Sequence, residues 1–269
     1  MIRIAAIDDE PLAELHYLNA ARRGGTEVCR LRIERAWTAS LPDGLDAIVA
    51  TSDLQGIVPS PSRGGEATLL GVAVAELLDE LAFDDVLPLA QRTGVLLAGD
   101  LYSVPEANRR GGHGDVSEVW RAFAERFAWV VGVAGNHDDL ARVRLGEAVH
   151  ALDGDVVQRD GQRIGGVGLI AGNPGKVGRR ALDDQLASIE LVAGSRVDIL
   201  LLHEGPCGED DQPGSAPIRA LVEAHTVPLT VCGHVHWGRP LAVHAGGQIL
   251  NVDTRVIVIQ QADPSGPGR

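Results

Sequence analysis

Short apolar runs recur along the chain, and a glycine or a polar residue follows each run closely. The runs span residues 47–51, 95–98, 129–133, 199–202 and 229–231. They are rich in leucine and β-branched residues, which is typical of strands that are buried on both faces. The pattern therefore predicts a set of buried strands whose carboxyl ends open into polar loops.

Segments with a helical spacing of apolar residues lie between these runs. They span residues 67–81, 116–127, 139–149, 181–193 and 218–224. A regular alternation of strand and helix indicates βαβ units. We therefore expect a layered α/β fold.

The two ends of the chain depart from this alternation. Residues 1–46 are interpreted as an added strand, helix and strand, with the acidic residues 8–10 as a turn and helix start. Three short strands are predicted after the last motif, at residues 240–244, 248–252 and 255–259. Tight glycine turns separate these strands without an intervening helix, so we expect them to complete a sheet edge.

The domain organisation that follows is simple. Residues 1–262 are expected to form one domain, in which residues 1–46 are an addition to the core. Two stretches rich in glycine, 59–65 and 109–115, are interpreted as mobile rims of a site. The Pro/Gly-rich end, 263–269, is expected to be a flexible tail.

Composition narrows the class of protein. The chain has 269 residues, 45% of them apolar, which is enough for a sizeable core. No apolar run approaches the roughly 18 residues of a membrane span, and the chain start shows no secretory signal pattern, so we expect a cytoplasmic protein without a membrane partner. The three cysteines, Cys29, Cys207 and Cys232, fit neither a disulfide framework nor a thiolate zinc site.

Charge argues against one large class of partner. The formal net charge is −13, and Lys176 is the single lysine. A protein that follows a nucleic acid over a long footprint neutralises phosphates with a basic face, which this composition does not supply. We therefore expect a small-molecule partner, and the sequence leaves the oligomeric state open.

Five polar motifs follow the predicted strands. They are Ser52-Asp53-Leu54-Gln55-Gly56, Gly99-Asp100, Gly135-Asn136-His137-Asp138, His203-Glu204 and Gly233-His234-Val235-His236. Each motif alone is common, and a single histidine after a strand is more often a structural residue than a ligand. The carboxyl ends of such strands converge at one edge, however, and carboxylate, amide and imidazole groups without thiolates suit divalent ions. The ordered set therefore predicts a metal centre.

This ordered set resembles the calcineurin-like metallophosphoesterase superfamily, whose motifs read Asp-x-His, Gly-Asp, Gly-Asn-His-Asp/Glu, His and Gly-His-x-His. The resemblance spans residues 53–236. It implies a four-layer α/β/β/α sandwich and two divalent metal ions about 3.5–4 Å apart. Manganese is favoured, with iron, zinc or nickel as alternatives, and the implied reaction is attack of a metal-bridging water on a phosphoester.

The resemblance also implies a role for each motif residue. The first ion would be held by Asp53, Gln55 and His236, and the second by Asn136, His203 and His234. Asp100 would bridge the two ions, and His137 would stabilise the phosphoryl group and protonate the leaving oxygen.

Gln55 stands where the family has a histidine. An amide oxygen is a poorer ligand than imidazole for zinc or iron but suits manganese or magnesium. Three outcomes remain open: full activity with manganese, reduced activity, or a site with one ion. His137 also lacks the family's orienting carboxylate, for which Asp138, Asp139 and Glu204 are candidates, although Asp138 and Glu204 fit structural roles equally well.

The substrate class follows partly from what is missing. Residues 101–105 lack the Asp and Arg that Ser/Thr protein phosphatases carry after Gly-Asp, so a small-molecule or nucleotide phosphodiester is favoured, with a phosphomonoester as the alternative.

Four arginines in glycine-containing stretches are candidate phosphate ligands or solvated loop charges: Arg109, Arg110, Arg179 and Arg180. Two rival functions remain, an inactive or weakly active metal- or nucleotide-binding protein of the same fold and a metal-dependent hydrolase of another bond, such as an amide.

Overall fold

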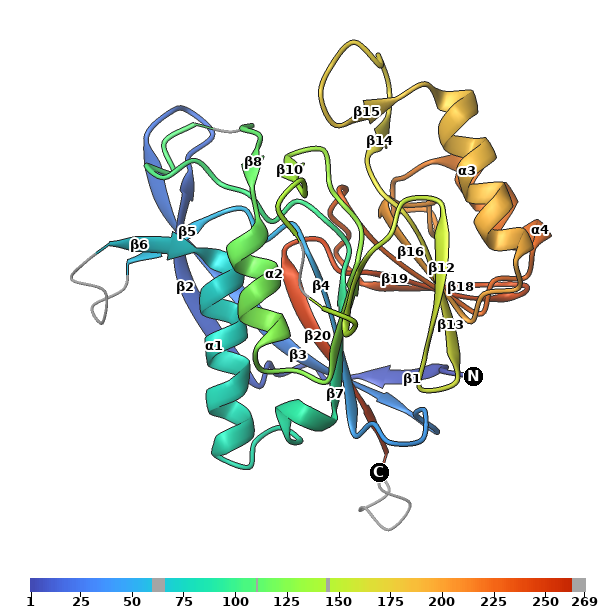
Figure 1. Ribbon diagram of the computed structural model, residues 1–269, viewed down its shortest axis with the longest axis horizontal. Helices are drawn as coiled ribbons and strands as arrows, with labels where there is room; N and C mark the ends of the chain where they lie inside the picture. The colour runs from blue at the N-terminus through green and yellow to red at the C-terminus, as the bar shows by residue number, and fades with distance from the viewer. Residues whose placement is uncertain (60–65, 110, 144–145, 263–269) are drawn as a thin grey trace.

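A computed structural model describes residues 1–59, 66–109, 111–143 and 146–262 (Figure 1). Most of the loop predicted at 59–65, Arg110 and the tail predicted at 263–269 lie outside these residues. The predicted strands are present as β4 (Ala47–Ser52), β7 (Thr93–Leu97), β9 (Trp129–Gly132), β16 (Ile199–Glu204) and β17 (Leu229–Gly233). The predicted α/β class is therefore confirmed.

Four of the five helices predicted between the apolar runs are present in the described residues. They are α1 (Leu70–Phe83), α2 (Ser117–Ala124), α3 (Leu182–Gly194) and α4 (Ala216–Ala224). The start of helix α4 is well defined. The Ser215 hydroxyl accepts a hydrogen bond from the Ile218 amide, and a proline follows in the first turn.

The larger sheet has ten strands in the order β11-β9-β7-β4-β20-β3-β2-β5-β6, and β1 pairs with β3. Its further strands are β1 (Ile4–Ile7), β2 (Ala13–Ala20), β3 (Thr26–Thr38), β5 (Ile57–Pro59), β6 (Ala67–Leu69), β11 (Val149–Ala151) and β20 (Arg255–Gln261). Strands β4, β7 and β9 are parallel neighbours, so their carboxyl ends lie at one edge.

The second sheet has six strands in the order β12-β13-β16-β17-β19-β18. Its further strands are β12 (Asp155–Arg159), β13 (Gln162–Val167), β18 (Leu241–His244) and β19 (Gly247–Asn251). The short elements are η2 (Ala90–Arg92), the pair β8 (Gly114–Asp115) and β10 (Asp138–Asp139), and the pair β14 (Ile170–Ala171) and β15 (Arg179–Arg180).

Three buried clusters define how these elements pack. One joins α1 and α2 to the outer face of the ten-stranded sheet, and another joins α3 and α4 to the outer face of the six-stranded sheet. The third lies between the two sheets, where Ile48 and Val131 belong to the same cluster as Leu201 and Val231. The inner cluster holds the two sets of strand ends in a fixed relation to each other.

Two predicted helices are wrong. Residues 139–149 contain no helix where they are described, because Asp138–Asp139 pairs with β8, Gly146 has a left-handed φ of 73°, and Val149 begins a strand that pairs with β9. Residues 1–46 form three strands without a helix, because β2 pairs with β3 over eight consecutive residues. In both segments, hydrogen bonding to strands elsewhere in the chain takes the place of the predicted helix.

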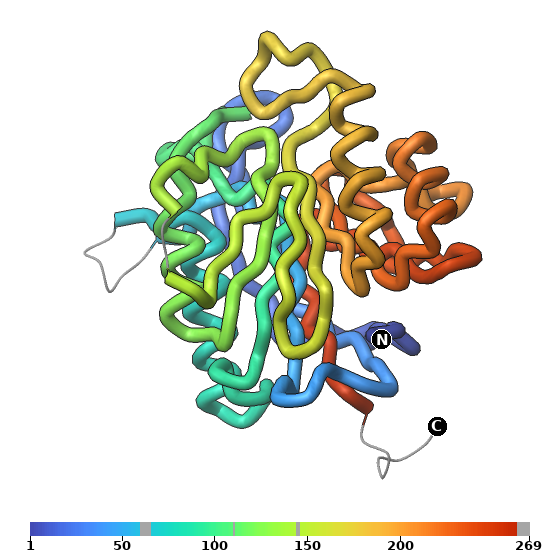
Figure 2. Tube along the Cα trace, turned by 45° about the vertical axis from the view of Figure 1, so that its right-hand side comes forward, coloured from blue at the N-terminus to red at the C-terminus, as the bar shows by residue number. Residues whose placement is uncertain are grey.

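The three strands predicted near the end of the chain are present, but they do not all lie at an edge. Strand β18 is the edge of the six-stranded sheet, whereas β20 lies inside the larger sheet, antiparallel to β4 and parallel to β3. Figure 2 shows this red C-terminal strand running among the blue strands of the N-terminal part. Residues 1–46 and β20 therefore fold together. Among the described residues, no helix is long and apolar enough to cross a membrane.

Candidate metal centre

Polar side chains from the two sheets meet where their parallel strands end. One ligand atom from each of Asp100, His203 and His234 lies within 4.8 Å of the others. Asp100 follows β7 in the larger sheet, while in the smaller sheet His203 lies on β16 and His234 directly follows β17. Residues more than 130 positions apart in the chain thus face one another across the join of the two sheets.

The imidazole of His203 is fully buried and held by hydrogen bonds. Its Nδ1–H donates to the Ala98 carbonyl at 2.8 Å, which leaves Nε2 directed at the cluster. That nitrogen lies 3.3 Å from Asp100 Oδ2 and 3.3 Å from Asn136 Oδ1. A backbone carbonyl at one ring nitrogen is a common way to fix a histidine so that its other nitrogen can bind a metal.

Three of the expected ligands have a left-handed backbone, which is uncommon for residues other than glycine. The φ angles are 54° for Asp53, 55° for Asp100 and 68° for His234. Such conformations concentrate at functional sites, where the surrounding structure compensates for their strain. Here Asp53 Oδ2 accepts hydrogen bonds from the Ser52 hydroxyl at 2.5 Å and from the His234 amide at 2.8 Å.

Two glycines allow this close approach. A Cβ atom at Gly135 would collide with the backbone nitrogen and the carboxylate of Asp100. A Cβ at Gly233 would collide with the Ser52 hydroxyl and the Asp53 carboxylate. These motif positions have no room for a side chain, because the loops at the strand ends contact each other, so only glycine fits.

The remaining two expected ligands contact the cluster less directly. Gln55 donates its side-chain N–H to Asp100 Oδ2 at 3.2 Å. The His236 ring donates from Nδ1 to Asp253 Oδ1 at 3.0 Å, and its side chain is 60% exposed. Asp253 was missed by the sequence analysis, although it directly follows the predicted strand 248–252 and so satisfies the rule that found the other motifs.

His137 lies beside the cluster. Its backbone amide donates to Asp100 Oδ1 at 2.9 Å, and its Nε2 is 3.9 Å from Asp100 Oδ2. Its Nδ1–H donates to the carbonyl of Gly112, a residue of the stretch 109–115 that is interpreted above as a rim of the site. A backbone carbonyl therefore orients this ring.

The three acids considered as orienting groups for His137 bind backbone amides. Asp138 Oδ1 accepts from Leu101 at 2.7 Å and Tyr102 at 3.1 Å, while its Oδ2 accepts from Gly135 at 2.9 Å. Glu204 accepts from the Ala171 amide at 2.6 Å, and Asp139 from the Ala141 amide at 2.9 Å. These contacts fit the structural roles that the sequence analysis left open.

The buried charges perturb one another strongly. Burial, together with the Asp253 and Asp100 charges, raises the pKa of Asp53 to about 8, although the charge of His203 opposes this. For His203 burial lowers the pKa, but the Asp100 and Asp53 carboxylates outweigh it and raise the pKa to about 10. Burial and the charge of His203 lower the pKa of His234 to about 4. A cation bound among these carboxylates would compensate the same negative charges, so metal binding is expected to compete with proton binding.

The donor set fits divalent ions. The groups are carboxylate oxygens, imidazole nitrogens and an amide oxygen, all buried or partly buried except at the exposed His236, which suit manganese, iron, zinc or nickel. Cys232, which precedes Gly233, is fully buried in the outer core of the smaller sheet, and burial raises the pKa of its thiol. It therefore acts as an apolar filler.

A cavity of about 300 Å³ opens beside Gln55 and His137, and Arg109 lines it. Arg180 instead bonds to Asp153 at 2.7 Å. Arg179 lies on β15, in the loop that carries the short pair β14 and β15. Arg109 thus lines the cavity beside two expected site residues, while Arg179 follows Gly178, whose backbone lies against that of Asn136.

Comparison with known proteins identifies the family. The calcineurin-like phosphoesterase family matches residues 47–238, so the chain belongs to this family, whose members are divalent-metal-dependent phosphoesterases. No curated protein matches the chain.

Two solved structures share the fold. The structure of TT1561 from Thermus thermophilus is 19% identical, covers 78% of this chain and 90% of its own, and has a TM-score of 0.51. A second is 11% identical, covers 79% and 91%, and has a TM-score of 0.53. The protein of unknown function AQ665 from Aquifex aeolicus, 15% identical over 79% and 95%, has a TM-score of 0.36, which is too low to support an argument.

Proposed function

We propose that the protein hydrolyses a phosphodiester of a small molecule or nucleotide, with two divalent ions bound at the strand ends and manganese as the preferred metal. The convergence of Asp100, His203 and His234 within 4.8 Å carries this proposal. Together with Asn136, these residues supply carboxylate, imidazole and amide donors for one ion, and Asp53, Gln55 and His236 supply donors for the other. Asp100 is shared between them.

Bound divalent ions would supply Lewis acidity, which offsets the charge of the phosphoryl oxygens and lowers the pKa of water. The hydrogen bond from the Nδ1–H of His137 to the Gly112 carbonyl, with Nε2 on the side of the cluster, supports a role for His137 in protonating the leaving oxygen. The cavity beside Gln55 and His137 has the size of a small-ligand pocket, and the presence of Arg109 in its lining supports a role for this arginine in holding a phosphate oxygen.

The first test compares metal content and turnover of bis(4-nitrophenyl) phosphate with added Mn²⁺. Asp100→Ala is expected to lose both metal and turnover, since it removes the shared ligand. His137→Ala is expected to keep the metal and to lose turnover about 100-fold or more, which is the usual scale for general acid catalysis. Retained turnover in Asp100→Ala would contradict the proposed centre.

The hydrogen bond from Gln55 to Asp100 favours keeping a second candidate, a weakly active or inactive binding protein of the same fold. In this contact the amide nitrogen faces the carboxylate, and the oxygen must turn inward before Gln55 can bind an ion. Gln55→His tests this point. A gain of metal stoichiometry or turnover assigns the weakness to Gln55, whereas identical values in the two proteins remove Gln55 from the centre.

A panel of phosphodiesters, phosphomonoesters and amides with Mn²⁺ separates the remaining alternatives. Tight nucleotide binding without turnover of any ester would identify a binding protein. Cleavage of amides alone would overturn the phosphoesterase proposal.

A further inference from the structure

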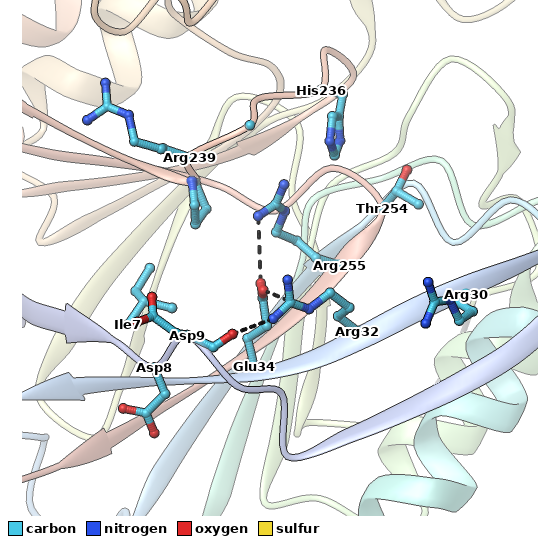
Figure 3. Close-up of a pocket in the computed structure, with 12 residues that line it drawn as sticks. Ile7, Asp8, Asp9, Arg30, Arg32, Glu34, His236, Arg239, Thr254 and Arg255 are labelled. Carbon is cyan, nitrogen blue, oxygen red and sulfur yellow. Dashed lines mark hydrogen bonds and ion pairs between the residues drawn. The ribbon is translucent and has the colours of Figure 1, made fainter.

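A second cavity, of about 520 Å³, opens beside His236 (Figure 3). Its walls come mostly from parts of the chain outside the family match. The N-terminal addition contributes the start of the β1–β2 turn and the strand β3, while the chain after residue 238 contributes Arg239 and the first residues of β20. His236 belongs both to this cavity and to the expected ligand set, so the cavity adjoins the metal centre.

Arginines are concentrated in the lining of this cavity, although the net charge of the protein is −13. Four arginines line it, Arg30, Arg32, Arg239 and Arg255, against the three acids Asp8, Asp9 and Glu34, which leaves an excess of one positive charge. Arg30 and Arg239 pair with acids outside the lining, through contacts between partly exposed side chains. Exposed pairs of this kind contribute little stability, so breaking one to bind a ligand costs little free energy.

The floor of the cavity holds two guanidinium groups on one carboxylate. Arg32 Nε lies 3.4 Å from Glu34 Oε1, and Arg255 Nη1 lies 3.6 Å from Glu34 Oε2. Arg255 is 8% exposed, and its Nε–H has no acceptor among the described residues. Burial lowers the pKa of Arg255, as expected for a charge that is incompletely compensated.

The carboxylate of Asp8 does not pair with the arginines at the floor. Asp8 accepts a hydrogen bond from the Trp37 indole at 2.8 Å, and Figure 3 shows its carboxylate directed away from Arg32 and Arg255. The backbone carbonyl of Asp9 accepts from Arg32 at 2.6 Å, which directs that guanidinium across the floor (Figure 3). The guanidinium groups of Arg32 and Arg255 therefore offer hydrogen-bond donors to an anion at the floor.

We propose that this cavity binds a second anionic group of the substrate, a carboxylate or a phosphate on the ester group that lies on the His236 side. The inference rests on the proposed phosphodiesterase function and narrows its substrate to diesters that carry a further negative charge. Arg32 and Arg255 hold that charge, and Arg30 and Arg239 extend the binding surface toward solvent. The other ester group occupies the cavity beside Gln55 and His137.

The test uses three diesters with the same scissile bond, 4-nitrophenyl phenyl phosphate and its derivatives with a carboxylate or a phosphonate at the para position of the phenyl ring. The native protein with Mn²⁺ is expected to show a kcat/KM about tenfold higher for a charged derivative, because charge-assisted hydrogen bonds to arginine are strong. The derivative with the larger gain identifies which anion the cavity accepts.

Arg32→Gln is the main variant, since its side chain is 45% exposed and its loss leaves the core intact. The ratio of kcat/KM between charged and uncharged esters is expected to fall toward one, and Arg30→Gln to lower it less. Arg92→Gln is the matched control, because Arg92 also pairs with an acid at the surface, Asp46, but lies before β7, at the opposite end of the strand from the metal centre. Its ratio should equal that of the native protein.

Binding separates this inference from the proposed function. Calorimetry of the metal-free protein compares neutral benzamide with benzoate and phenylphosphonate. Tighter binding of either anion, lost in Arg32→Gln, supports the cavity even when no ester is cleaved, which would overturn the phosphodiesterase proposal alone. Equal binding and equal turnover of the three esters would overturn the anion site, and so would a preference for a para-trimethylammonium ester.

Discussion

Asp138 is expected to join two strand-end loops of the metal centre rather than to act on His137. Its carboxylate accepts three backbone N–H groups, two from residues that follow Asp100 and one from Gly135. The side chain is buried, and burial together with the Asp100 charge raises its pKa. Asp138→Ala would leave these buried donors without an acceptor.

The magnitude follows from this count. A buried donor left unpaired costs about 1–3 kcal/mol, so three of them predict a loss of about 3–9 kcal/mol in the free energy of unfolding. Asp138→Asn keeps Oδ1 for two of the bonds but turns an NH₂ group toward the Gly135 amide, while it also removes the repulsion with Asp100. We expect about 1–2 kcal/mol for the Asn variant, because one donor is left unpaired and the lost repulsion offsets part of that cost.

Urea denaturation of the metal-free proteins measures both values. Asp139→Ala is the matched control, because this neighbouring acid accepts one exposed hydrogen bond from Ala141. It should cost less than about 1 kcal/mol. If Asp138→Ala were no less stable than Asp139→Ala, the bridging role would be refuted.

Three further predictions concern the centre itself. The affinity for Mn²⁺ should rise with pH through neutrality, because a cation must displace protons from Asp53, with a pKa of about 8, and His203, with a pKa of about 10. Calorimetry in buffers of different ionisation enthalpy counts these protons, and no release would contradict the electrostatic argument. Asp253→Ala leaves Nδ1 of His236 without its partner, so chelator titration should show one ion bound about 10- to 100-fold more weakly; two unchanged ions would exclude this role. Gly135→Ala should lower the free energy of unfolding by about 2 kcal/mol or more, since its methyl group collides with a neighbouring loop. A thermal melt equal to that of the native protein would show that the loop can yield.

The class of the fold and the expected ligands can be predicted from the amino-acid sequence alone. Buried strands such as 47–51 and 229–231 are recognisable because apolar runs end abruptly in glycine and polar residues. That local signal places Asp53, Asp100 and His234 at strand ends without any knowledge of the sheet order. It also marks the position of Gln55, where this chain departs from its family.

The tertiary structure decided what depends on pairing between distant segments. Residues 13–20 lie in the segment where a helix is predicted yet form a strand, because β3 supplies eight consecutive partners. Strand β20 enters the middle of the larger sheet and brings Arg255 against Glu34 and Asp253 against His236. No local pattern predicts these contacts, because they depend on how distant segments pair. Arg255 and Glu34, for example, are more than 200 residues apart in the chain. The arginine-lined cavity therefore became visible only when the two ends of the chain were seen in one sheet.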